Sequence, residues 1–205
     1  NRPPVRVGPS VIDMGTGSYL VIAILDALRE RDREGKGTKL EFNLLETALS
    51  WMAPSIAGYS ITGNLPQRQG SALAVYSPYQ VFKANDGYLF IGAATQRACE
   101  RLGAALERPE WLEDPRFADR ATRVEHRSAL TVLIEAHLAT QTVGDAVDAV
   151  RAAGVPCAPV NTLQDIIDDP HVAEREVRSR HVDPHVGQGI QARGPLGKPP
   201  DVPPQ

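Results

Sequence analysis

The hydrophobic and polar positions in the first quarter of the chain predict two helices with a strand between them. Residues 17–33 are typical of a helix that is apolar all round in its first half, charged in its second half, and ended by Gly35. The turn at residues 35–37 precedes an expected short strand at residues 39–44, and a second helix is expected at residues 45–56. The order of helix, strand and helix indicates an α/β layer.

The pattern changes at residues 58–77, which are rich in Gly, Pro, Ser and Gln. This composition favours a connector, so we place a domain boundary there. Beyond it, two apolar runs at residues 79–83 and 88–92 flank Asn85-Asp86-Gly87, a strong short signal for a β-hairpin. The second domain is therefore expected to open with a hairpin.

Capping signals predict the elements that follow. Thr95 is placed to cap a helix that runs to about residue 106, and Thr142 with Asp145 resembles a capping box for a helix that stops at Gly154. Apolar periodicity predicts a further helix at residues 123–139. Prolines keep residues 155–160 extended, and a short helix at residues 163–168 is expected to end before Pro170. The last dozen residues, from 194 onward, are Pro-rich and are interpreted as a tail.

Composition narrows the classes of function. The 205 residues are 42% hydrophobic, and the formal net charge is -3, with 22 basic and 25 acidic residues scattered along the chain. A folded protein is expected, and nucleic-acid binding is not, because no basic run follows the sequence. The longest apolar stretch, residues 19–25 continuing through 27 and 28, is far shorter than the roughly 20 residues of a membrane span, so no transmembrane helix is predicted. Without a signal sequence or a disulfide framework, the cytoplasm is the expected compartment.

The first candidate for chemistry is Asp13, which stands between a short apolar segment and the glycines Gly15 and Gly17. Unpaired backbone N–H groups at a helix start favour an ionised carboxylate and can bind a developing oxyanion, as a carboxylate nucleophile requires. Glycines at positions 15 and 17 leave room for a bulky substrate. The alternative is that Asp13 only caps the helix, and the heptapeptide by itself favours that alternative.

Other reactive residue types give weaker signals. The five histidines show no pair with a Cys or an acid at a metal-ligand spacing, so no metal is predicted, and Cys157 is interpreted as a small apolar residue. Lys36 and Lys39 are interpreted as solvated side chains of a turn.

The wider pattern resembles the class III CoA-transferase family, which includes formyl-CoA and carnitine-type transferases, with the α-methylacyl-CoA racemases as relatives. The resemblance covers roughly residues 5 to 178. The matching segments, in chain order, are Asp13 with Gly15-Thr16-Gly17, the apolar helix through Ala27-Leu28, Arg33 to Gly37, the segment into Leu44 to Ala48, Ser77 to Phe82, Asp86 to Gly92, Pro109-Glu110-Trp111, Asp114 to Phe117, Arg123 with Arg127, and Ala153 to Val160.

This resemblance implies an α/β fold, with part of a Rossmann-like large domain and a small α+β domain opened by the β-hairpin. The expected divisions are residues 1–57 for the large-domain part, 58–76 for a linker, 77–178 for the small domain, and 179–205 for a return segment and tail. After Val177 the sequence departs from the family's return segment. The resemblance implies a homodimer, which is interlocked in complete relatives, and that departure puts the interlocking in doubt for this chain.

The resemblance also implies a reaction. The residue matching Asp13 attacks an acyl-CoA thioester to form an aspartyl anhydride, then an aspartyl-CoA thioester, and CoA passes to a carboxylic acid acceptor. Acyl-CoA and carboxylic acids are thus the expected partners, and no separate cofactor is expected. Gly15, Gly17, Leu44, Gly70 and Ser71 are the candidate substrate- or CoA-contacting residues. Leu44 is equally well interpreted as a core leucine, and Gly70 and Ser71 as part of a hinge or linker.

Two alternatives remain open at this stage. An acyl-CoA racemase would exchange the proton α to the thioester carbonyl, using a His upstream of the Asp that this sequence does not include. An inactive fragment or structural subunit is the other alternative, because the portion that holds the CoA nucleotide in relatives does not match any segment here.

Overall fold

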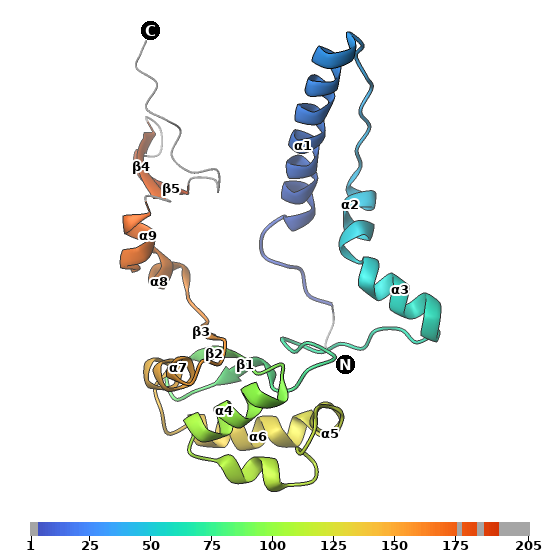
Figure 1. Ribbon diagram of the computed structural model, residues 1–205. Helices are drawn as coiled ribbons and strands as arrows, with labels where there is room; N and C mark the ends of the chain where they lie inside the picture. The colour runs from blue at the N-terminus through green and yellow to red at the C-terminus, as the bar shows by residue number, and fades with distance from the viewer. Residues whose placement is uncertain (1–3, 176–177, 184–186, 193–205) are drawn as a thin grey trace. The chain divides into compact units, whose positions relative to one another are not determined.

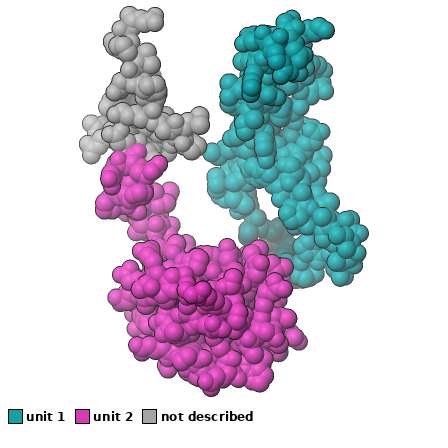
Figure 2. Space-filling view, in the orientation of Figure 1, with its two compact units in different colours: residues 1–68 teal, residues 69–205 magenta. Residues whose placement is uncertain are grey.

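The computed structural model describes residues 4–175, 178–183 and 187–192, and it divides into two compact units, residues 1–68 and 69–205 (Figures 1 and 2). Across the described residues the protein is rich in helices and has a small antiparallel sheet.

Unit 1 begins with the long helix α1 (Val11–Glu34). Its end was predicted: Gly35 has φ 72°, a left-handed conformation that glycine adopts without a Cβ clash, and its N–H donates to the Arg31 carbonyl at 2.7 Å. Its start at residue 17 was predicted wrongly. The helix begins six residues earlier, and it passes through Gly15 and Gly17 because the apolar residues before them continue the helical turn.

The strand predicted at residues 39–44 is wrong, since this segment is irregular up to Asn43. The Asn43 side chain accepts from the Glu46 N–H at 2.8 Å and thereby starts helix α2 (Leu44–Trp51) at Leu44. The helix predicted at residues 45–56 is also divided. A second helix, α3 (Ala53–Thr62), follows Met52 with Pro54 in its first turn, where the missing proline N–H is tolerated.

Unit 2 contains the predicted β-hairpin. Strand β1 (Tyr79–Lys83) pairs antiparallel with β2 (Tyr88–Gly92), and the Ala84 N–H donates to the Gly87 carbonyl at 2.9 Å across the turn. A third strand, β3 (Cys157–Pro159), pairs antiparallel with β2, in the segment predicted to be extended. The sheet order is therefore β1-β2-β3.

The helices of unit 2 are α4 (Gln96–Ala105), the 3-10 helix η1 (Pro109–Glu113), α5 (Arg120–Glu125), α6 (Arg127–Leu138) and α7 (Val143–Ala152). Thr95 caps α4 and Thr142 caps α7, as predicted. The single helix predicted at residues 123–139 is wrong in two respects. It starts earlier, because Asp119 forms a capping box at the start of α5, and it is interrupted at His126.

The described core lies in unit 2, where the helices pack with the three-stranded sheet (Figure 1). Residues of β1 and β2 alternate between buried and more exposed positions, which is the period-2 pattern of a sheet with one face on the core. The largest buried apolar side chains of this core are Phe82, Leu89, Ile91, Leu106, Phe117, Ile134, Leu138 and Val150.

The remaining elements of unit 2 are α8 (Leu163–Asp168), α9 (Pro170–Glu174) and a hairpin of β4 (Arg178–Asp183) with β5 (Gly187–Ala192). Helix α8 has the predicted bounds and is opened by a capping box between Thr162 and Asp165. Pro170 then begins α9, which was not predicted. The Pro-rich tail from residue 194 lies outside the described residues.

Candidate catalytic site

Asp13 is the third residue of α1, in the first turn of the helix. The residue at the N-cap is Ser10, so Asp13 is not the cap, and its side chain is exposed. Within the described residues, this carboxylate makes no hydrogen bond or ion pair, and the N–H groups of Ile12 and Asp13 find no acceptor. An accessible carboxylate thus lies beside two unpaired helix-start donors, which carry partial positive charge.

Gly15 lies two residues after Asp13, where α1 contacts α2. A Cβ placed on Gly15 would overlap the Cη2 and Cζ2 atoms of the Trp51 ring. The Trp51 indole in turn donates its Nε1–H to the Tyr19 hydroxyl at 2.9 Å, and the two rings meet edge to face with centroids 6.5 Å apart. Gly15 therefore gives a tryptophan room to pack on the helix. A Cβ at Gly17 would meet nothing within 4 Å.

A second contact between α1 and α2 is polar. The Thr16 hydroxyl lies 2.9 Å from the Thr47 hydroxyl and 2.8 Å from the Ile12 carbonyl oxygen, which belongs to the first turn of α1. Thr47 is only 5% exposed. These contacts, with those of Trp51, hold α2 against the start of the helix that carries Asp13.

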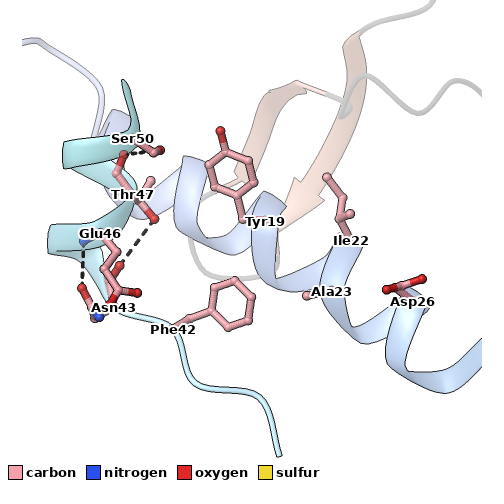
Figure 3. A pocket seen from close by; sticks show the side chains of 9 residues that line it. All are labelled: Tyr19, Ile22, Ala23, Asp26, Phe42, Asn43, Glu46, Thr47 and Ser50. Carbon is pink, nitrogen blue, oxygen red and sulfur yellow. Dashed lines mark hydrogen bonds between the residues drawn. The ribbon is translucent and has the colours of Figure 1, made fainter. Parts of the chain in front are cut away.

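Two hollows lie along this helix pair. The smaller, about 460 Å³, is lined by Met14, Gly15 and Ser18 beside Asp13, together with Trp51. The larger, about 660 Å³, lies between α1 and the segment leading into α2, and Figure 3 shows its wall of Tyr19, Ile22, Ala23, Asp26, Phe42, Asn43, Glu46, Thr47 and Ser50. Asp13 lines neither hollow. The apolar walls of the smaller one suit the uncharged part of an acyl or pantetheine chain.

The other predicted contact residues lie elsewhere in the two units. Leu44 is the first residue of α2, and its side chain is 49% exposed. Gly70 and Ser71 belong to unit 2. Gly70 has φ 61°, and the Ser71 hydroxyl oxygen accepts from the Val81 N–H at 3.1 Å, so Ser71 ties its segment to β1. Their roles toward substrate stay predictions.

Sequence reasoning did not single out Trp51, Tyr19 or Thr47. A signal for Tyr19 was present, because positions 15, 19, 22, 23 and 26 follow the spacing of one helix face. No comparable local pattern marks Trp51 or Thr47, because their contacts are made across 32 and 31 residues of sequence.

By length and composition alone, α1 meets the requirements for crossing a bilayer: it is 24 residues long and contains an 18-residue stretch of high mean hydropathy. The uninterrupted apolar run is much shorter than this helix, so the run alone did not predict this property. A core helix of a large domain and a signal sequence meet the same requirements, so no membrane location follows from it. In the described ranges, no group of three His, Cys, Asp or Glu side chains is placed to hold a metal ion.

The fold matches solved structures of one class. A CaiB/BaiF family protein from Brucella suis is 32% identical, with a TM-score of 0.78 over 98% of this chain and 52% of that chain. Succinyl-CoA--D-citramalate CoA-transferase of Chloroflexus aurantiacus is 32% identical over 92% of this chain and 47% of its own length. Succinyl-CoA:glutarate CoA-transferase of Mus musculus is 31% identical over 94% of this chain and 44% of its own.

The model of CoA-transferase family III matches residues 1–200. The chain belongs to this family. It spans about half the length of the curated relatives named above.

Proposed function

We propose that this chain carries the catalytic carboxylate of an enzyme that transfers coenzyme A from an acyl-CoA donor to a carboxylic acid acceptor, with Asp13 as the nucleophile. One observation carries the proposal: in a chain of this family, Asp13 stands exposed and unpaired in the first turn of α1. A carboxylate engaged in an ion pair or a cap would have to give up that partner before it could attack.

The proposed reaction has two parts, and each begins with the attack of a carboxylate on a thioester. A carboxylate oxygen of Asp13 attacks the thioester carbonyl, the carbon–sulfur bond breaks, and the CoA thiolate departs. The product is a mixed anhydride of Asp13 and the donor acid. The thiolate then attacks the aspartyl carbonyl and releases the donor acid, which leaves an aspartyl-CoA thioester. The acceptor carboxylate attacks this thioester, and the expelled thiolate attacks the acceptor's carbonyl, which regenerates Asp13. The unpaired N–H groups of Ile12 and Asp13 are placed to stabilise negative charge near this carboxyl group.

The same proposal extends to the protein's setting. Unit 1 is interpreted as part of a Rossmann-like large domain, and unit 2 as the body of a small α+β domain. Leu44, Gly15, Gly17, Gly70 and Ser71 are proposed to contact the substrate or CoA. A homodimer, a cytoplasmic location and the absence of a separate cofactor belong to the proposal as well.

Trapping the covalent intermediate tests the proposal. The complete enzyme is incubated with succinyl-CoA, treated with hydroxylamine, digested and examined by mass spectrometry. We expect an aspartyl hydroxamate in the peptide that contains Asp13, formed from the anhydride or the thioester, and none in the Asp13→Asn variant. Modification of another carboxylate, or none during active turnover, would refute the assignment. Deuterium incorporation at the α-carbon of a chiral 2-methylacyl-CoA without acid exchange would instead indicate a racemase.

A further inference from the structure

Unit 2 contains a buried cation, Arg123, that forms no salt bridge within the described residues. Arg123 of α5 is only 1% exposed, yet its guanidinium group bonds neutral atoms: Nε–H donates to the Ser77 carbonyl at 3.2 Å, and Nη1–H to the Phe117 carbonyl at 2.8 Å. Its Nη2 has no hydrogen-bond partner in the described part of the chain. Burial of a charge without a counterion is unfavourable, so the free side of this guanidinium favours an anion.

Arg123 also lines an open cleft of about 670 Å³. A second arginine, Arg120, lines the same cleft, and its guanidinium carbon lies 5.9 Å from the centre of the Tyr76 ring. Stacking of this kind holds the planar group in place while leaving its edge N–H donors available. The cleft thus has one buried and one exposed guanidinium group among its walls.

The start of α4 adds neutral donors to the same cleft, which Thr95 and Gln96 line. The Thr95 hydroxyl oxygen accepts from the Ala98 N–H at 3.1 Å, which leaves its own hydrogen able to donate. Among the described residues, the N–H groups of Gln96 and Arg97 have no acceptor. Amides at the start of a ten-residue helix attract negative charge.

One acid, Asp119, also lines the cleft, and two alanines complete it. The Asp119 Oδ1 accepts from the Ala121 N–H at 2.7 Å and the Thr122 N–H at 3.0 Å, so this carboxylate caps α5. The Thr122 backbone bond, with a smaller contribution from the Arg123 charge, holds the pKa of Asp119 below its usual value. Two arginines against one ionised, engaged carboxylate leave the cleft with a net positive charge.

We propose that this cleft binds an oxyanion, a carboxylate or a phosphate group, between Arg120, Arg123 and the start of α4. The inference is independent of the chemistry proposed for Asp13, because it rests on residues of unit 2 alone. A planar or tetrahedral group with two or three oxygens can accept from both guanidinium groups and from the helix amides together.

Titration of the ¹⁵N-labelled 205-residue chain with succinate, and separately with inorganic phosphate, tests the site by amide chemical shifts at constant ionic strength. We expect saturable shifts at residues 95–97 and 119–123. Saturation by succinate alone identifies a carboxylate site, and saturation by phosphate alone identifies a phosphate site. If neither anion gives saturable shifts there, the inference is overturned.

Matched variants separate the cleft from general surface charge. Arg120→Gln removes one exposed donor group from the cleft, and we expect affinity to fall about tenfold. Arg151→Gln makes the same change of charge on α7, outside the cleft, and is expected to leave affinity unchanged. Equal affinities for the parent and Arg120→Gln, or equal losses in the two variants, would show that the anion binds elsewhere.

Discussion

The two units of this chain bury their apolar residues to very different extents. Unit 2 has a core in which Leu89, Phe117 and Leu138 are 0% exposed. In the described part of unit 1, Thr47 is the one buried residue, while Ile22 of α1 and Leu45 of α2 are 63% and 67% exposed. Unit 1 nevertheless carries Asp13, the proposed nucleophile.

This difference separates the chemistry of the chain from its stability. Unit 2 has the layered packing of sheet and helices that stabilises a small domain by itself. Unit 1 has helices whose apolar faces find few partners within the unit. Substitution of the proposed nucleophile in unit 1 is therefore expected to change turnover, and substitution of the most buried residues of unit 2 to lower the free energy of unfolding.

The largest expected effect is on turnover. Asp13→Asn in the complete enzyme should lower the rate of CoA transfer on the order of a thousandfold or more, because an amide cannot form the anhydride. The free energy of unfolding should change by less than about 1 kcal/mol, since the side chain loses only its favourable interaction with the helix start. The measurement is steady-state transfer from succinyl-CoA.

Glu30→Gln is the matched control on the same helix, at an exposed position seventeen residues further along that lines neither hollow. It should keep the parental rate of transfer. If Asp13→Asn kept the parental turnover, the proposed catalytic role of Asp13 in unit 1 would be wrong.

The next effect concerns stability, and it is tested by making the same substitution, leucine to alanine, in each unit. Leu138→Ala deletes a fully buried side chain of α6 and should lower the free energy of unfolding by about 2–5 kcal/mol. Leu45→Ala, at an exposed position of α2, should change it by less than about 0.5 kcal/mol.

Each unit contains one tryptophan, so urea unfolding can be followed separately: Trp111 reports on unit 2 in a Trp51→Phe background, and Trp51 reports on unit 1 in a Trp111→Phe background. A loss in unit 1 from Leu45→Ala as large as that in unit 2 from Leu138→Ala would mean that the two units are packed alike.

A smaller effect tests the packing that unit 1 does have. Gly15→Ala places a methyl group against the Trp51 ring and should destabilise the contact between α1 and α2 by about 1–3 kcal/mol. Gly17→Ala meets nothing and should stabilise the helix by about 0.5–1 kcal/mol, because alanine loses less conformational entropy. Fluorescence of Trp51 in the Trp111→Phe background measures both variants, and effects of the same sign would contradict the geometry.

The smallest effect is the acid sensitivity of unit 2. Hydrogen bonds from the Arg116 side chain and backbone lower the pKa of Asp114 to about 2 from its usual 3.8. Because the pKa of Asp114 is lower in the folded state than in the unfolded state, the ionised carboxylate stabilises the folded state at pH values above the unfolded pKa. That stabilisation is lost as pH falls from about 4 towards 2. The urea midpoint reported by Trp111 should therefore fall in this range, and by less in Asp114→Asn. An identical fall in both proteins would exclude Asp114 as a cause.

Local signals in the sequence predicted unit 2 better than unit 1. The turn at Asn85-Asp86-Gly87 and the caps Thr95 and Thr142 act within a few residues, so the sequence is sufficient to place the hairpin and the starts of α4 and α7. The expected strand at residues 39–44 failed because apolar character alone does not provide a neighbouring strand, and the Asn43 cap acts in favour of a helix.

The candidate site shows the same limit. Asp13 was proposed from its local pattern and from the resemblance of the chain to a family, but its lack of any partner is a property of the folded surroundings. The contact of Gly15 with Trp51 and the burial of Arg123 depend on residues distant in sequence. No periodicity or spacing in a single sequence encodes such contacts.

Arg127 illustrates how one side chain can fix a segment without constraining its composition. Its guanidinium group donates to the Gln69 side chain at 2.8 Å and to the backbone carbonyls of Leu73, Ala74 and Tyr76 at 2.8 to 3.1 Å. Carbonyl oxygens are present whatever residue occupies those three positions. Mutational drift in residues 73–76 is therefore compatible with this anchor, whereas a lysine at position 127 would lack the forked geometry needed to reach several acceptors at once.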